Sequence, residues 1–505
     1  YVKFKSLSSR YHYLPYQSTE MSQYSKSLND HNSPENVAKL AVYQKWVFSA
    51  TFFNYAMAHW TRKSYTNVKM SLIAAGVDPL TLAAMDSGFM FTYAGGSFVT
   101  GMLGDRFSPV VVIAGGLLGS TLCLFLIIIG ASTSIVHTLA ICGTWFLSCQ
   151  LLHGLFQATG GPVNTAIMGS WFPAKGRGLV FGLWTCHQYV GDIAAALFSA
   201  WILRGGMDWR WCIVVPAVIN GIWAFANLFA VPNRPEEAGI LTEASVKSDA
   251  AKAAATRAGE AHAAEPEPIG FVQAFLLPNV MSYAIAFGFF KLVNYAMFFQ
   301  LPLILSSHFD QSTSNLISAL YSVGMMPGGI VCGWVSDIYG GRRACVIATF
   351  MGILCPLLLV FAYYMDTLPV LTLLILLAFM GCLVGGPNNI ITSAVAADLA
   401  EDPSIRGNNR ALGTVTGIIN GSGSITAAIG QLAIPVLYGW GKEAGVGYRY
   451  VWFFLVFCTI TGTALMGGKI IKELQPANAH EGERLIALTT RHAGYQSVST
   501  SEDRA

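Results

Sequence analysis

Windows of about 20 apolar residues recur along the chain, and this recurrence constrains the fold more than any other feature. A helix of that length matches the apolar thickness of a bilayer. Only 11% of the residues are charged, whereas a soluble globular domain carries about 25%. Because backbone polar groups must be paired inside the apolar layer, these windows predict membrane-spanning helices. We therefore expect an all-α, polytopic membrane protein.

We count twelve such spans, six in each half of the chain. Those of the first half fall near 45–73, 84–104, 110–130, 137–168, 178–204 and 211–231. Those of the second half fall near 277–305, 316–336, 343–364, 368–397, 411–439 and 448–471. The expected domains are a polar segment at 1–44, a bundle at 45–231, a charged Ala-rich linker at 232–270, a bundle at 271–472 and a tail at 473–505.

Lysine and arginine residues gather in the connections on one side of the predicted spans. They include Arg106, Lys175, Arg234, Arg342 and Arg406. Cytosolic loops of membrane proteins carry such an excess, so both termini are expected in the cytosol. The positive residues form no continuous basic face, and we expect no nucleic-acid partner.

The two halves share an internal repeat. GMLGDRFS at 101–108 returns as GWVSDIYGGRR at 333–343, and GGPVNTAIMGSW at 160–171 returns as GGPNNIITSAVAADL at 385–399. Each pair is about 230 residues apart and follows even-numbered spans, so both members face the same side. The halves are therefore expected to be parallel six-helix repeats, related by an axis along the membrane normal.

Six plus six helices with these loops resemble the major facilitator superfamily. By that resemblance, Asp105 with Arg106, and Asp337 with Arg342 and Arg343, would form a cytosolic latch between helix ends. Helix capping and positive-inside charge are the alternative reading of the same residues. Under either reading these residues concern gating and topology rather than substrate choice.

Lys291 lies at the middle of the apolar stretch 278–302, about 18 Å from either end of a helix. Snorkelling from that depth is implausible, and a cation there usually faces a bundle interior or a water-filled cavity. Lys291 is therefore expected to attract an anion. No carboxylate in the predicted spans matches its depth.

Arg62 and Lys63 interrupt the first span. If its helix continues to Ile73, the pair lies about half-way along, and Tyr55, His59 and Arg62 share one face at i, i+4 and i+7. The alternative is that both are interfacial anchors. Arg62 and Lys291 come from the first helix of each half, so the repeat predicts them on opposite walls of a central cavity, where a phosphate dianion could bridge them.

The fifth span carries His187 and Gln188, with Asp192 beyond them. His187 is either a structural histidine or a substrate or proton contact, and Asp192 could hold it charged. Gly160–Pro162 and Gly385–Pro387 lack the pattern of a nucleotide loop and predict close helix packing and bending.

Three asparagines, Asn164, Asn388 and Asn389, are expected to add cavity hydrogen bonds. Gly421 and Gly423 predict a close-packed face of the eleventh span. No metal-ligand cluster, cofactor motif, or nucleophile with a base is present at membrane depth, so neither a metal site, a cofactor nor an enzyme is expected.

At these residues the chain resembles the organophosphate:phosphate antiporters, and within them the eukaryotic sugar-phosphate (glucose-6-phosphate) exchanger family. The resemblance is carried by HWTRKSYTNVK at 59–69, LWTCHQYVG at 183–191, FFKLVNYAMFFQLPL at 289–303 and RALGTVTGIINGSGSITAAIG at 410–430, among other stretches. It implies that Arg62 and Lys63 are a phosphate-binding pair, that Lys291 is the cation of the seventh span, and that Tyr55 and His59 line the cavity. The candidate substrate site also includes His187, Gln188, Asn294, Tyr295 and Asn388. Bacterial members differ, with an arginine at the Asn294 position, a lysine at Ser97 and their histidine at Gln188.

The expected function is exchange of a phosphorylated sugar or glycerol phosphate, such as glucose 6-phosphate or glycerol 3-phosphate, for inorganic phosphate. A proton- or sodium-coupled organic-anion symporter and a transport-dead sugar-phosphate sensor are the alternatives. The resemblance implies a monomer in the lipid bilayer of the endoplasmic reticulum; other endomembranes or the plasma membrane are the alternative locations.

Overall fold

The computed structural model describes residues 32–132, 139–172, 177–242, 271–396, 399 and 411–475. Within them every regular element is a helix. The first half contains α3 (Pro34–Asn67), α4 (Lys69–Ala74), α5 (Pro79–Arg106), α6 (Pro109–Ser132), α7 (Leu139–Gln157), α8 (Gly160–Trp171), α9 (Arg177–Trp184), α10 (His187–Arg204), α11 (Trp211–Ala230) and η2 (Pro235–Ala238). The second half contains α13 (Phe271–Phe275), α14 (Val280–Leu305), α15 (Gln311–Ile338), α16 (Arg343–Tyr364), α17 (Val370–Ile390), η3 (Ile391–Val395), α19 (Ala411–Glu443), α20 (Arg449–Leu465) and α21 (Gly467–Leu474). The expected all-α fold is confirmed.

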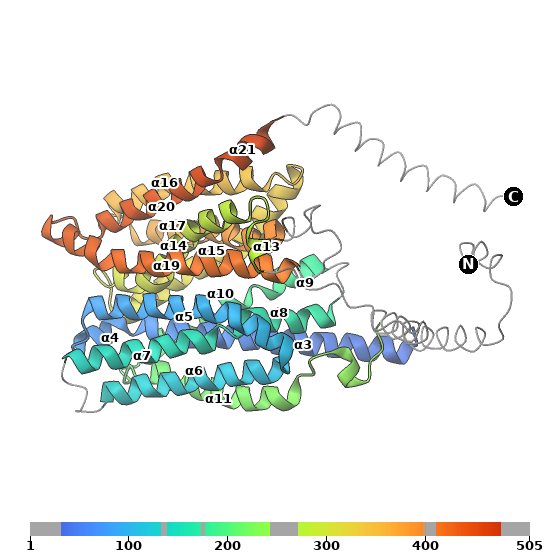
Figure 1. Cartoon of the computed structure of the whole chain (residues 1–505). Helices are drawn as coiled ribbons and strands as arrows, with labels where there is room; N and C mark the ends of the chain where they lie inside the picture. Colours follow the sequence, from blue (N-terminus) through green and yellow to red (C-terminus); the bar gives the residue numbers. More distant parts are fainter. Residues whose placement is uncertain are drawn as a thin grey trace, which may run out of the picture.

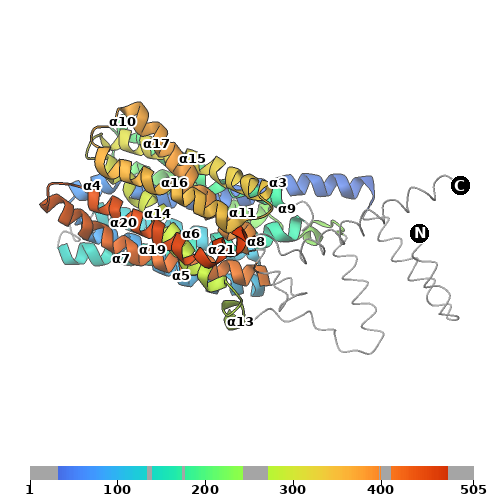
Figure 2. The same cartoon turned by 90° about the horizontal axis from the view of Figure 1, so that it is seen from above.

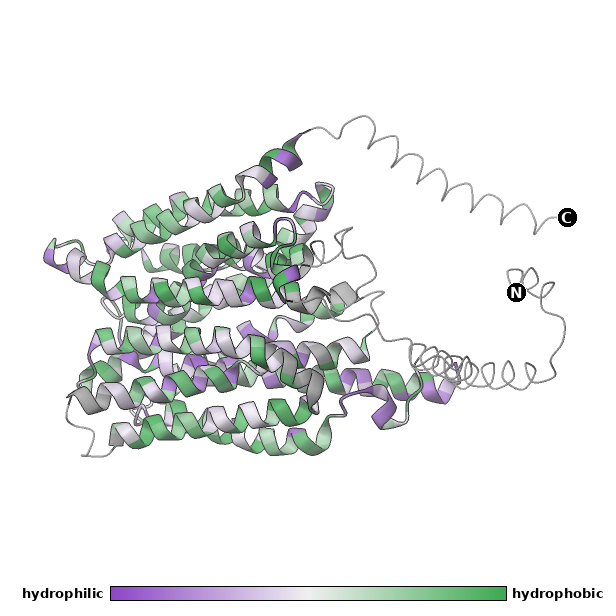
Figure 3. Ribbon diagram, in the orientation of Figure 1, coloured by the Kyte–Doolittle hydropathy of each residue, from purple (hydrophilic) through white to green (hydrophobic). Residues whose placement is uncertain are grey.

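The two halves form two layers of roughly aligned helices. In Figure 1 the helices of the first half lie below those of the second, and Figure 2 shows the second half covering the first. The span window of α14 is 78% buried inside the protein, whereas that of α11 is 39% buried. Helices on the outside, such as α6 and α11, are mostly hydrophobic in Figure 3. Helix α14 therefore occupies the protein interior, as a membrane helix with a central charge must.

Six of the described helices are long and apolar enough to cross a membrane alone, and α20 with α21, bent by 53°, would add a seventh. The other long helices carry polar and charged side chains or are divided by short breaks. The predicted span 45–73 is α3 and α4, the span 137–168 is α7 and α8, and the span 178–204 is α9 and α10.

Helix α3 begins at Pro34, well before the first span predicted at residue 45. Ser33 caps it, because its Oγ accepts a hydrogen bond from Asn36 N at 3.2 Å, and Pro34 stands at the first helical position, where it suits a helix start. Asn36 also exchanges two hydrogen bonds with the backbone of Leu241, at 2.9 and 3.0 Å. This contact with the start of the linker extends the helix beyond the apolar window.

Hydrogen bonds join the two halves at the end where α3 and α14 finish, which we call the far end (left in Figure 1). The break at Val68 frees the carbonyl of Asn67, which accepts from Gln311 Nε2 at 2.7 Å and from Asn315 Nδ2 at 3.0 Å. Ser312 Oγ donates to Ala200 O at 2.8 Å. The far end is thus closed by direct contacts between the halves.

Gly421 and Gly423 both lie at close contacts of α19, but they are two residues apart, about 200° of helical rotation, and so lie on two sides of the helix rather than on one face. A Cβ atom on Gly421 would lie 2.3 Å from the ring of Phe98 on α5, in the opposite half. A Cβ atom on Gly423 would lie 2.8 Å from the ring of Phe287. Because such distances are far inside van der Waals contact, α19 can approach these rings only where it lacks side chains.

Substituting Gly421 by alanine should loosen this contact. Overpacking costs typically about 1–3 kcal/mol, so we expect a lower melting temperature for the purified Gly421→Ala protein in detergent. Gly417→Ala is the matched control, since a Cβ atom there meets nothing within 4 Å. Equal melting temperatures for the two variants would contradict the packing described.

Candidate functional site

In the part of the chain that the structure describes, four lysine and arginine side chains are buried in the interior of the bundle: Arg62, Lys63, Lys69 and Lys291. Only Lys69 has a carboxylate partner. Among the described residues no carboxylate lies within 4.0 Å of Arg62, Lys63 or Lys291. Because an unpaired charge is costly away from water, the groups that surround these three cations decide what the interior can bind.

Arg62 is held by neutral groups. Its Nε and Nη2 atoms donate to the amide oxygen of Gln157 on α7, at 3.0 and 2.9 Å. Its Nη1 atom donates to the hydroxyl of Tyr295 on α14, at 3.1 Å, and so reaches into the other half. The guanidinium carbon lies 4.9 Å from the ring centroids of both Phe89 and Tyr93, which stabilise it by cation–π attraction.

Lys291 is held by three oxygen atoms of α19. Its Nζ donates to Asn420 Oδ1 at 2.6 Å, to Asn420 O at 3.1 Å and to Ser424 Oγ at 2.8 Å. A Cβ atom on Gly423 would lie 3.0 Å from Lys291 Cδ, so the glycine leaves room for the lysine stem. The ammonium also lies 5.6 Å from the ring centroid of Tyr295. Arg62 and Lys291 thus approach Tyr295 from two different helices, one in each half.

Lys63 donates a hydrogen bond to the backbone carbonyl of Phe298 on α14, and its ammonium lies 4.4 Å from the ring of the same residue. The carbonyl is available because of Pro302, four residues further on. Pro302 has no N–H to donate, so the Phe298 carbonyl lacks its usual helical donor four residues further on. A backbone carbonyl of one half therefore accepts from a cation of the other.

Lys69 on α4 forms a buried ion pair with Asp86 on α5, with Nζ 2.5 Å from Oδ2. Lys69 also donates to Phe299 O at 2.9 Å, and Gln300 Nε2 donates to the same carboxylate oxygen at 3.0 Å. Both contacts reach α14. The pair thus fastens the first half to the second near the far end.

His59 lies beside Asp192 on α10, with Nδ1 3.0 Å from Oδ1. The suggestion that Asp192 holds His187 charged is wrong. His187 and Asp192 are five residues apart, about 500° of helical rotation, so they lie on different faces of α10. The ring of His187 instead contacts those of Tyr55 and Trp184, at 4.3 and 4.5 Å. Asp192 is itself buried, so this carboxylate lies within the bundle.

The other residues predicted for the site have partners other than the cations. Tyr55 OH lies 3.2 Å from Tyr93 OH, beside Arg62. Asn294 Oδ1 accepts from Tyr321 OH at 3.1 Å, within the second half. Gln188 Nε2 lies 3.4 Å from Asn389 Oδ1, across the halves.

Asn388 is partly buried next to Asn389, and its carbonyl accepts from Thr392 Oγ1 at 3.0 Å. The side chains of Asp105 and Arg106, which belong to the predicted latch, lie outside the described residues. Asp337 and Arg342 are exposed at the protein surface. The latch therefore stays a prediction.

Sequence reasoning missed the buried cation Lys69 and the polar side chains that hydrogen-bond the cations: Gln157, Asn420, Ser424 and Asp86. Amides and hydroxyls are frequent in membrane helices, so the first three gave no distinctive signal. Asp86 lies near the start of its predicted span, where a carboxylate at the membrane interface is common and does not by itself indicate a site. A search for polar residues at i and i+4, such as Asn420 and Ser424, could have found one of these groups.

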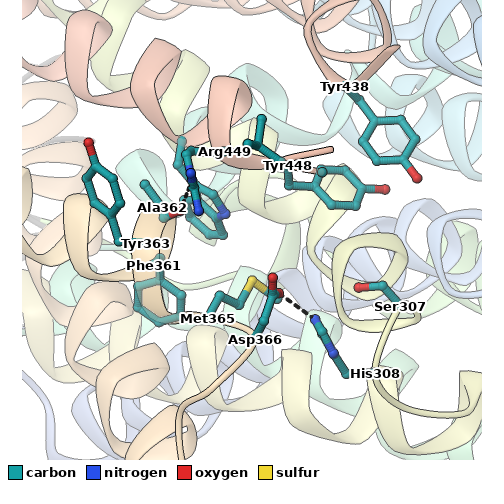
Figure 4. A pocket seen from close by; sticks show the side chains of 13 residues that line it. Ser307, His308, Phe361, Ala362, Tyr363, Met365, Asp366, Tyr438, Tyr448 and Arg449 are labelled. Atoms are coloured by element: carbon teal, nitrogen blue, oxygen red, sulfur yellow. Dashed lines mark hydrogen bonds and ion pairs between the residues drawn. The ribbon is translucent and has the colours of Figure 1, made fainter. Parts of the chain in front are cut away.

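A separate pocket of about 200 Å³ lies in the second half, between the ends of α14, α16 and α19 and the start of α20. Figure 4 shows its polar groups, with His308 Nε2 3.0 Å from Asp366 Oδ1 and Arg449 among aromatic rings. Arg449 Nε donates to Ala362 O at 3.1 Å. None of the buried cations lines this pocket. It is therefore distinct from the central cluster, by which we mean Arg62, Lys63 and Lys291 with the groups that hold them.

The comparisons with known proteins agree with this architecture. The model of the Major Facilitator Superfamily matches residues 47–431. Sugar phosphate exchanger 3 of Gallus gallus is 31% identical to the chain over 476 residues, which cover 85% of this chain and 92% of the relative. The chain belongs to the major facilitator superfamily, in the family of the sugar phosphate exchangers. The family resemblance predicted from the sequence is confirmed, and the protein is an integral, multi-pass membrane protein.

Other superfamily members match over similar lengths. The putative glycerol-3-phosphate transporter 1 of Arabidopsis thaliana is 31% identical over 486 residues, covering 87% of this chain and 89% of that protein. Among solved structures, a bacterial homologue of the human lysosomal transporter Spinster, in an inward-facing and occupied conformation, matches with a TM-score of 0.60 at 15% identity. That structure covers 86% of this chain and 99% of its own. It supports the major facilitator fold alone.

The Lys69–Asp86 pair can be tested by removing one charge. Asp86→Asn leaves a buried ammonium without a counter-charge, which typically costs about 3–5 kcal/mol, so we expect a marked fall in melting temperature in detergent. In Lys69→Met/Asp86→Leu both charges are absent, and stability should return close to that of the wild type. A single variant as stable as the wild type would show that the pair does not fasten the halves.

Proposed function

We propose that this chain is a secondary active transporter that exchanges a phosphorylated sugar or glycerol phosphate for inorganic phosphate by alternating access. The observation that carries the proposal is the group of unpaired cations contributed by both halves: Arg62 and Lys63 from α3 and Lys291 from α14. The names of the relatives, which include sugar phosphate exchangers and glycerol-3-phosphate transporters, support the same substrate class.

The charge of the interior fits a phosphate dianion. Among the described residues, the four buried basic side chains outnumber the two buried carboxylates, Asp86 and Asp192, which leaves an excess of two positive charges. A phosphate monoester carries about −1.5 to −2 at pH 7, because its second pKa is about 6. A guanidinium offers two donors in one plane and an ammonium offers a compact charge, which together suit the oxygens of one phosphate group.

The same charge favours exchange over uniport. An empty interior must enclose two uncompensated cations each time the halves close around it, whereas a bound phosphate supplies their counter-charge. Inorganic phosphate and a phosphate ester share the group that does this. Either one therefore permits the conformational change, and the return of the empty carrier is disfavoured.

We further propose that the protein acts as a monomer in the endoplasmic reticulum membrane, with both termini in the cytosol. The lysines and arginines between even-numbered and odd-numbered spans support this orientation. The location follows from the resemblance to the glucose-6-phosphate exchangers.

The second candidate function is proton-coupled symport of an organic anion. The buried His59–Asp192 pair favours it, because such a pair beside the site could take up a proton with the substrate. Uptake driven by a pH gradient, without phosphate on the opposite side, would support symport. Dependence on trans phosphate supports exchange.

The main proposal is tested with purified protein in proteoliposomes. Labelled glucose 6-phosphate or glycerol 3-phosphate should enter vesicles preloaded with inorganic phosphate. In Arg62→Ala or Lys291→Ala, the loss of a charge-assisted contact should reduce the initial uptake rate at low substrate concentration about 10- to 100-fold.

Arg210→Ala and Lys442→Ala are the matched controls, since they remove the same charges from residues outside the central cluster. Both should retain the wild-type rate. Undiminished uptake in both Arg62→Ala and Lys291→Ala would remove the proposed site.

A further inference from the structure

Four of the buried basic residues have side-chain partners of two kinds. Lys69 and His59 lie against carboxylates, those of Asp86 and Asp192. Arg62 and Lys291 lie against side-chain amide oxygens, those of Gln157 and Asn420. An amide oxygen accepts the same hydrogen bonds as a carboxylate oxygen but carries no net charge. The partner therefore decides how much of each cation's charge remains for a ligand.

The orientation of the Gln157 amide follows from its neighbours. Arg62 has donors only, so the amide oxygen must face the guanidinium. The Nε2 atom of Gln157 then points the opposite way, where it lies 2.9 Å from both Ala58 O and Thr61 Oγ1. Thr61 can accept there because its hydroxyl proton is directed to the backbone carbonyls of Met57 and Ala58, at 2.9 and 3.0 Å. These contacts tie the amide to α3, the helix that carries Arg62.

His153, one turn earlier on α7, completes the support. Its Nε2 lies 3.0 Å from Gln157 Nε2, and its Nδ1 lies 3.0 Å from Gln150 Oε1. A donor at Nδ1 and an acceptor at Nε2 satisfy both contacts, which is the neutral form of the ring. The side chains behind Gln157 thus add no charge to the site.

Asn420 has the same role on the other wall. Its Oδ1 atom accepts from Lys291 at 2.6 Å, and the second side-chain ligand, Ser424 Oγ, is also neutral. Ser424 itself donates to the Asn420 carbonyl at 3.0 Å, four residues earlier on α19. The ammonium is oriented by three oxygens without losing its charge to any of them.

We propose that Gln157 and Asn420 are positioning residues that fix the two phosphate-binding cations while preserving their full charge for a dianionic ligand. This inference rests on the proposed function of the site. It predicts that a carboxylate of the same size at either position orients the cation equally well but neutralises it. The site then carries one positive charge fewer and binds phosphate more weakly.

A structural role and a charge-preserving role of Gln157 predict opposite rankings of the Gln157→Glu and Gln157→Leu variants in phosphate binding. Gln157→Glu keeps an acceptor for Arg62 and loses the hydrogen bonds that Nε2 donates to Ala58 O, Thr61 Oγ1 and His153 Nε2. Gln157→Leu loses those donated bonds and the acceptor as well. If Gln157 served only to support the helices, the leucine variant would be the more damaged of the two, whereas a charge-preserving role makes the glutamate variant the worse binder.

The test measures phosphate homoexchange in proteoliposomes, together with inorganic phosphate binding by the purified proteins, followed as a ligand-dependent rise in melting temperature. We expect the KM for phosphate to be at least about tenfold higher in Gln157→Glu than in Gln157→Leu. The glutamate variant should melt no lower than the leucine variant in the absence of ligand. Asn420→Asp and Asn420→Leu should show the same order.

Dependence on the charge of the ligand gives a second readout. Lowering the pH from about 7.5 to about 5.5 converts the dianion largely to the monoanion, and the wild-type KM should rise. The rise should be smaller in Gln157→Glu, because its site no longer matches a dianion. A purely structural defect would leave the pH dependence unchanged.

The inference is overturned if Gln157→Glu binds phosphate as tightly as, or more tightly than, Gln157→Leu. Failure of this inference can be distinguished from failure of the proposed function. If the wild type exchanges no phosphate ester for phosphate, the proposed function fails, while phosphate binding by the purified variants still decides the role of the two amides.

Discussion

The structure depends on enclosing positive charge within a protein interior without matching it with negative charge. Water would solvate these cations, and carboxylates would neutralise them; the bundle does neither for Arg62, Lys63 and Lys291. It surrounds them with amide oxygens, hydroxyls, two backbone carbonyls and the faces of aromatic rings. Each of these groups stabilises a cation through a dipole or quadrupole and leaves the net charge unchanged.

This arrangement also explains why the buried cations of the first half depend on the second half for their hydrogen-bond partners. Arg62 and Lys63 each find a partner on α14, in the opposite half, and Lys69 does the same. A half separated from its neighbour would expose cations that have lost part of their solvation. The cohesion of the bundle therefore has a polar component at its centre, beside the apolar packing that glycines such as Gly421 permit.

The sequence predicted most of the fold and the cations of the site, because apolar windows, their repeat and charges inside them are local signals. It did not predict the groups that hold those cations. Whether Gln157 meets Arg62 depends on how α7 is rotated against α3, which one window cannot specify. Asp192 was assigned to the histidine nearest in sequence, whereas helical rotation turns it toward His59. Similarly, the part of α3 that precedes the apolar window contacts Leu241, which is far away in the chain.

Pro302 links the hydrogen bonding of Lys63 to the contact between the two halves. The carbonyl of Phe298, freed by Pro302, is the one hydrogen-bond acceptor recorded for Lys63 among the described residues, and it belongs to the other half. Under the proposed alternating access, parting of the far end would separate this donor from its acceptor. A ligand that satisfied Lys63 in only one orientation of the protein would then bias the direction of opening.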